Sequence, residues 1–89
     1  SQRDQEKIRR LGRAMPSALQ IYQMLLKRPV TNINLLVKET GLTPATVNKT
    51  LRQLEQLDIV KEQTSQKRNR IFCYQDYLHF MERGTEVSR

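Results

Sequence analysis

The chain has 89 residues, of which 37% are hydrophobic and 28% are charged, and it carries a formal net charge of +7. This length allows one small domain with a modest core, and no apolar run approaches the ~20 residues that a membrane span requires. The single cysteine, Cys73, excludes an intrachain disulfide and is typical of a reducing, cytoplasmic setting. The basic excess makes a polyanion the first partner to consider, although net charge can also serve solubility alone.

The first 13 residues are mostly polar and carry five cations against two acids, with Ile8 and Leu11 three positions apart. This pattern fits either a helical arm that packs weakly or a linker. The polar chain ends and the start at Ser1 suggest a piece of a longer protein. The expected division is an arm or linker helix over residues 1–15, a folded domain over 16–83 and a polar tail over 84–89.

The first helix expected in the domain follows Pro16. Apolar residues keep the spacing i, i+3, i+4, i+7 of a core-facing helix, at Ala18, Ile21, Tyr22 and Leu25. Pro29 restricts the residue before it, so the helix should end at Arg28. Residues 30–34 form a connector or a short strand, in which Asn32 or Asn34 could cap the next helix.

Residues 35–57 contain the signals of two helices joined by a tight turn. Gly41 stands where a helix C-cap needs positive φ, Thr43 can cap the following helix, and Pro44 suits its first position. Val47, Leu51 and Leu54 follow at i, i+4, i+7 and predict a buried side. This pattern is typical of a helix-turn-helix.

The other side of the second helix is small or polar and carries two cations, and no acid occurs in its first three turns. Such a face can enter a DNA major groove. The free N–H groups at the helix start, near Thr43, Ala45 and Thr46, could also hold a phosphate. The predicted contacts on this helix are Thr43, Ala45, Thr46, Asn48, Lys49 and Arg52.

A β-hairpin is predicted next. Residues 59–64 form an expected strand with Ile59, Lys61 and Gln63 on one face, and residues 70–74 form its partner. The five-residue turn at 65–69 is basic. Lys67, Arg68 and Arg70 could hold a DNA backbone or minor groove, although Arg70 could instead pack its stem along the sheet.

A last helix should start at Gln75 or Asp76 and end at Gly84, with Tyr77, Leu78, Phe80 and Met81 available to pack back. The whole order is three helices, a hairpin and a helix. The predicted fold is therefore mainly α with a small β-hairpin: a winged helix-turn-helix with a three-helix core, a wing and flanking terminal helices.

No residues are spaced for catalysis, a metal or a cofactor. His79 lacks the partners of a zinc site, and no nucleophile–base arrangement is visible. Cys73 is expected in the core. The tyrosines Tyr74 and Tyr77 are also expected there, although this pair could instead stack on a base.

Several motifs resemble the C-terminal winged-helix domain of bacterial Fic proteins, whose catalytic domains transfer AMP to hydroxyl groups. The motifs are Gly-Leu-Thr-Pro at 41–44, Thr-Val-Asn at 46–48, Leu-Glu-Gln-Leu-Asp-Ile-Val at 54–60, Lys-Arg-Asn-Arg at 67–70, Tyr-Gln-Asp-Tyr-Leu at 74–78 and Gly-Thr-Glu at 84–86. Gly-Arg-Ala at 12–14 and Pro-Ser-Ala at 16–18 resemble the entry to that domain. The family usually has a charged residue at the position of Leu35 and an apolar one at that of Thr40.

The Fic catalytic motif, His-Pro-Phe or His-Pro-Ile before a Gly-Asn-Gly-Arg loop, is absent, so this chain is not expected to be an enzyme. The resemblance implies a bacterial, double-stranded-DNA-binding module that targets or regulates a Fic-type protein. The alternative is a docking or homodimerisation domain that regulates the catalytic domain without binding DNA. In that case Leu35 would lie at an interface.

Overall fold

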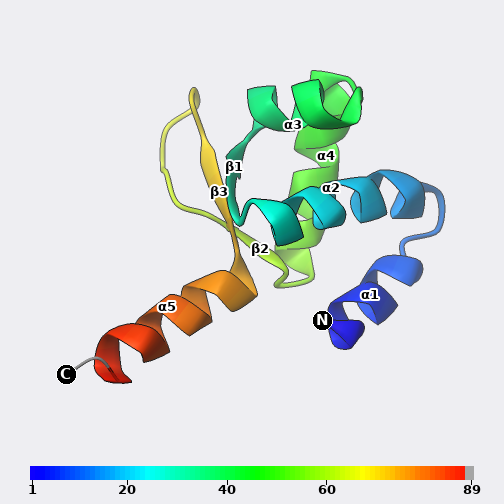
Figure 1. The fold of residues 1–89 in the computed structure, drawn as a ribbon. Helices are drawn as coiled ribbons and strands as arrows, with labels where there is room; N and C mark the ends of the chain where they lie inside the picture. Colours follow the sequence, from blue (N-terminus) through cyan, green and yellow to red (C-terminus); the bar gives the residue numbers. More distant parts are fainter. Residues whose placement is uncertain (88–89) are drawn as a thin grey trace.

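The computed structural model describes the backbone of residues 1–87 and the side chains of residues 1–83 (Figure 1). Its elements in chain order are α1 (Gln2–Arg9), the 3-10 turn η1 (Gly12–Ala14), α2 (Met15–Lys27), β1 (Val30–Asn32), α3 (Ile33–Thr40), α4 (Pro44–Gln56), β2 (Val60–Glu62), β3 (Ile71–Tyr74) and α5 (Gln75–Val87). Helices α2, α3 and α4 pack on one another, and a small antiparallel sheet closes one side of them. This architecture confirms the predicted winged helix-turn-helix.

The turn between α3 and α4 has the predicted chemistry. Asn32 caps α3 by accepting the Leu35 N–H at 2.8 Å, which starts the helix two residues earlier than the predicted stretch. Gly41 has φ +77°, a left-handed conformation that favours glycine. Thr43 then accepts the Thr46 N–H at 3.2 Å and starts α4. These caps fix the angle at which α4 leaves α3.

The sheet has the order β1-β3-β2, so the connector strand β1 is part of it. The predicted face of the first hairpin strand is wrong. Asp58 has φ +60° and ends α4, with the Ile59 N–H bonded back to the Leu54 carbonyl at 3.0 Å. The strand therefore alternates only from Val60 onward. Ile59 and Val60 are both buried, whereas Lys61 and Gln63 are exposed.

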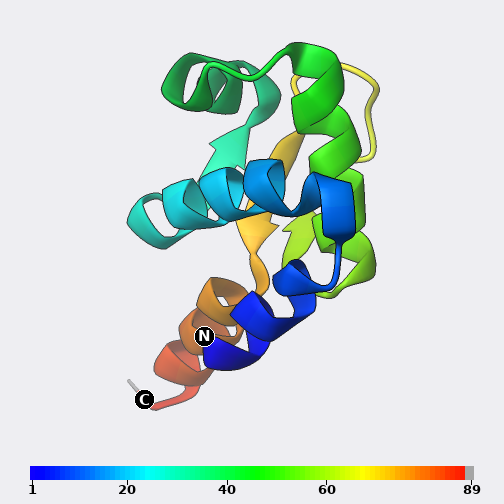
Figure 2. The ribbon, with the colours of Figure 1, turned by 90° about the vertical axis from the view of Figure 1, so that its right-hand side faces the viewer.

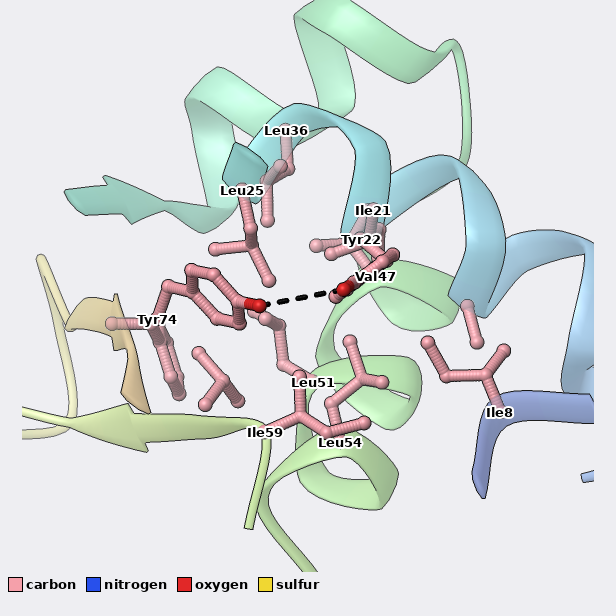
Figure 3. Packing of buried hydrophobic residues seen from close by; sticks show 13 residues of the cluster. Ile8, Ile21, Tyr22, Leu25, Leu36, Val47, Leu51, Leu54, Ile59 and Tyr74 are labelled. Atoms are coloured by element: carbon pink, nitrogen blue, oxygen red, sulfur yellow. Dashed lines mark hydrogen bonds between the residues drawn. The ribbon is translucent and has the colours of Figure 1, made fainter. Parts of the chain in front are cut away.

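One apolar core joins the helices to the sheet (Figure 3). Its labelled members come from α1, α2, α3, α4, β3 and the α4–β2 turn: Ile8, Ile21, Tyr22, Leu25, Leu36, Val47, Leu51, Leu54, Ile59 and Tyr74. Cys73 is buried as predicted, and burial raises the pKa of its thiol. The amphipathic spacings thus located the core faces of α2 and α4 correctly.

Helix α1 differs from the expected weakly packed arm or linker. Ile8 is fully buried, and the Lys7 ammonium donates to the Leu57 carbonyl at the end of α4 at 2.9 Å. The two apolar residues in an otherwise polar segment gave too weak a periodicity to predict this packing. Helix α1 is therefore an integral part of the fold.

A buried polar cluster holds α1 in place. Tyr74 donates to the Asp4 carboxylate at 2.8 Å, and the Tyr22 hydroxyl lies 3.3 Å from that of Tyr74. Burial would raise the pKa of Asp4, but hydrogen bonds from Tyr74, the N-terminal ammonium and Ser1 outweigh it and lower this pKa. Burial, together with the bonds to Tyr22 and Asp4, raises the pKa of Tyr74. The cluster joins α1, α2 and β3 through one carboxylate.

Helix α5 leaves the body of the molecule after its first turn (Figure 1). Tyr77 packs against the core as predicted, but Phe80 is 69% exposed, so its predicted packing is wrong. Met81 is 47% exposed. The helix also continues through Gly84, where it was expected to end, to Val87. The last two residues of the predicted tail, 88 and 89, lie outside the described residues.

Candidate nucleic-acid interface

The exposed side of α4 carries the residues predicted to contact DNA. Ala45, Lys49 and Arg52 are exposed, and Thr46 and Asn48 are half-buried beside them. The opposite side holds fully buried Val47, Leu51 and Leu54. The core thus fixes the rotation of α4 about its axis and turns the cations to solvent.

The start of α4 is capped by its own side chains. Thr43 is exposed, and its hydroxyl accepts the Thr46 N–H and also donates to the Thr46 hydroxyl at 3.0 Å. Of the N–H groups predicted to hold a phosphate, that of Thr46 is therefore already paired. Thr43 acts as a helix cap in this structure.

The hairpin wing comprises residues 63–70, between β2 and β3. Lys67 and Arg68 near its tip are exposed. Neither forms an ion pair, because the ion pairs recorded among residues 1–83 are Ser1–Asp4 and Glu62–Arg70. Both side chains can therefore meet an anion without first breaking a contact to a carboxylate.

Arg70 differs from its two neighbours. Its Nη2 and Nε atoms donate to the two carboxylate oxygens of Glu62 at 2.6 and 2.8 Å, and its guanidinium carbon lies 5.8 Å from the centre of the Phe72 ring. The hydrogen bond from Arg70 outweighs burial and lowers the pKa of Glu62, and the same bond raises the pKa of Arg70. The geometry thus favours the structural alternative for Arg70.

Shallow hollows lie on both sides of the α4 face. The hollow between α4 and the wing has a volume of about 300 Å³ and is lined by Arg52, Lys67 and Arg70 among others. A hollow of similar volume on the other side is lined by Thr46 and Lys49 of α4 and by Arg13 and Ser17. A third, of about 570 Å³, separates the wing from residues 32–34.

Arg13 and Ser17 were missed by the sequence analysis. Their nearness to α4 depends on how η1 and α2 dock on that helix, which the local pattern around them does not specify. Figure 1 shows the start of α2 and the wing on opposite sides of α4, and Figure 2 shows the start of α2 beside α4. The cationic surface therefore extends beyond the helix and wing that were predicted.

The remaining titratable side chains of residues 1–83 are dispersed. They contain no group of three His, Cys, Asp or Glu side chains placed to hold a metal ion, and His79 is exposed. Among the described helices, none is both long and apolar enough to traverse a bilayer.

A known family matches the helical part of the domain. Residues 16–61 match the family described as winged helix-turn-helix DNA-binding. This segment covers α2 from its second residue, β1, α3 and α4, together with the first two residues of β2. Searches of curated proteins and of solved structures gave no match.

Proposed function

Because the chain belongs to the winged helix-turn-helix DNA-binding family, we propose that α4 inserts its exposed face into the major groove of double-stranded DNA. The observation that carries the proposal is the set of unpaired cations on and around this face. Lys49 and Arg52 project from α4, and Arg52 lines one hollow together with Lys67 of the wing. Lys49 and Arg52 lie on one side of α4, and the other side of this helix is anchored in the core.

Each predicted residue on α4 has a contact that its chemistry allows. Lys49 and Arg52 can donate to guanine N7 and O6 or to phosphate oxygens, and Asn48 can pair with adenine. Ala45 and Thr46 can contact a thymine methyl group or a base edge. Thr43, the cap, positions the helix start next to the backbone.

The wing holds the DNA backbone or the minor groove through Lys67 and Arg68. Arg70 supports this contact indirectly, because its pair with Glu62 braces the base of the hairpin. Lys67 and Arg68 are then held at the tip of a hairpin whose base is fixed.

The biological setting that we propose follows from the sequence motifs alone. The resemblance to the C-terminal domain of Fic proteins favours a module that targets or autoregulates an AMP-transferring protein in the bacterial cytoplasm. Transcription regulation would follow if the DNA site overlaps a promoter. The transfer chemistry would belong to a part of such a protein outside residues 1–89.

Fluorescence anisotropy of the 89-residue protein on labelled duplex DNA, across a salt series, tests the proposal. We expect log K to fall linearly with log[salt], with a slope lowered by about one unit when Lys49→Ala or Arg68→Ala removes a phosphate contact. Lys27→Ala is the matched control, because Lys27 is an exposed cation at the far end of α2. Absence of binding at ~50 mM salt, or equal slopes in all variants, would overturn the proposal.

The alternative function, docking or homodimerisation without DNA binding, predicts a different result in solution. Leu35 is half-buried within the domain. A dimer seen by light scattering that Leu35→Glu dissociates, together with no DNA binding, would favour a docking or homodimer function.

A further inference from the structure

The hollow beside the start of α2 has the composition of an anion site. Its lining consists of Leu11, Arg13, Ala14, Ser17, Thr46, Lys49, Thr50 and Gln53. It includes two cations, three hydroxyl groups and one amide, but no carboxylate. A surface of hydrogen-bond donors without an acid favours a phosphate over a cation or an apolar ligand.

The two cations of this hollow are available. Arg13 and Lys49 are both exposed, and neither takes part in the ion pairs recorded for residues 1–83. They come from separate elements, η1 and α4, whose packing brings them to one hollow. Two cations at one hollow attract an anion more strongly than either would alone, because their Coulomb energies add.

One residue that lines the hollow, Gln53, has a buried polar atom without a hydrogen-bond partner. The Gln53 side-chain oxygen is buried and has no hydrogen-bond partner among the described residues. A buried acceptor without a partner costs free energy that a donor would recover. A backbone phosphodiester carries no donor, so the Arg13 guanidinium or the Lys49 ammonium would have to supply that hydrogen bond.

The hollow lies where a DNA backbone would pass if α4 occupied the major groove. An α-helix with its side chains is about 10–12 Å across, close to the roughly 12 Å width of the major groove. With α4 in the groove, elements on its two sides meet the two sugar-phosphate backbones. The wing lies on one side of α4 and the start of α2 lies on the other (Figures 1 and 2). Arg13 and Ser17 line the hollow between the start of α2 and α4.

From this geometry we propose that Arg13 and Ser17, with Thr46 and Lys49, form a phosphate-binding site for the DNA backbone opposite the one held by the wing. The inference rests on the proposed function, since it requires α4 to enter the major groove. In this arrangement Lys49 serves the hollow as well as the helix face. The protein would hold the duplex from both sides of α4.

Anisotropy titrations of Arg13→Ala, compared with Arg10→Ala, test the site. Arg10 is an exposed cation three residues earlier and gives the same change in net charge. We expect Arg13→Ala to weaken binding about 3- to 10-fold near 100 mM salt and to lower the salt slope by about one unit, while Arg10→Ala leaves the slope unchanged. Ser17→Ala should weaken binding by a smaller factor.

Neutral methylphosphonate linkages placed one at a time along each strand identify the phosphate. A methylphosphonate at one position, on the strand opposite the one that the wing contacts, should weaken DNA binding by the wild type. The same linkage should not weaken DNA binding by Arg13→Ala. Equal effects of Arg13→Ala and Arg10→Ala, or no such position, would overturn the site while leaving DNA binding by α4 and the wing intact. Absence of salt-dependent binding by the wild type would overturn both proposals. Thermal unfolding of each variant establishes that it is folded.

Discussion

The two polar regions of this molecule satisfy their charges in different ways. Where α1 meets α2 and β3, the Asp4 carboxylate is buried and accepts hydrogen bonds from Tyr74 and the chain terminus. On the α4 and wing side, Lys49, Arg52 and Arg68 are exposed and form no ion pair. A charge whose partners lie within the protein stabilises the fold. A charge without internal partners remains free for a ligand.

The wing shows the same contrast within four residues. Arg70 is paired with Glu62 at the root of the hairpin, whereas Lys67 and Arg68 are exposed near its tip. Sequence position alone does not separate them, because all three belong to one basic run. The difference depends on Glu62, which the register of β2 and β3 brings across from Phe72.

The largest effect on stability is expected for Asp4→Ala. Loss of the carboxylate leaves the buried Tyr74 hydroxyl without its acceptor on α1, and the free energy of unfolding should fall by about 2 kcal/mol. Urea unfolding measures this change. Glu6→Ala, which removes an exposed acid from the same helix, should change stability by less than about 0.5 kcal/mol. If Asp4→Ala and Glu6→Ala lowered the unfolding free energy by similar amounts, the proposed difference between paired and free charges would be wrong.

The wing arginines should separate stability from binding. Arg70→Ala breaks the bonds to Glu62 and should lower the urea concentration at the midpoint of unfolding. Arg68→Ala should leave stability within about 0.5 kcal/mol of wild type and lower the DNA salt slope. Urea unfolding and anisotropy on the same samples give both quantities. The reverse assignment, with Arg68 stabilising the fold, would contradict the structure.

The smallest effect concerns pH. The folded state lowers the pKa of Asp4, so its contribution to stability is present above the ordinary carboxyl pKa and is lost as pH falls through the lowered value. Unfolding free energies measured between pH 6 and pH 3 should therefore decline less in Asp4→Asn than in wild type. Glu62, whose pKa is also lowered, contributes in the same direction in both proteins and serves as the internal reference.

Much of the fold could be predicted because its determinants are local. Caps at Thr43 and Gly41 and the apolar spacing of α2 and α4 are readable within a few residues. The packing of α1 could not be predicted. Its burial depends on Tyr22 and Tyr74, whose hydroxyls meet Asp4 from distant parts of the chain.

The location of the candidate site on the fold was predictable to a similar extent as the fold itself. The exposed face of α4 follows from its helical period, and the structure places all the predicted α4 residues on or beside it. The pairing of Arg70 with Glu62 and the approach of Arg13 to Lys49 were not predictable, because both depend on tertiary packing. The exposed Phe80 is a similar case, since the direction in which α5 leaves β3 decides its surroundings.

The central position of β3 has a consequence for how the protein assembles on the ribosome. β3 (Ile71–Tyr74) is the strand to which both β1 and β2 pair, and β1 is separated from it by about forty residues of chain. Helices α2, α3 and α4 can therefore emerge and associate while β1 still lacks its neighbour. Pairings between distant segments form slowly, because a large loop must close first. We therefore expect the sheet to close after the helices, when synthesis has passed Tyr74.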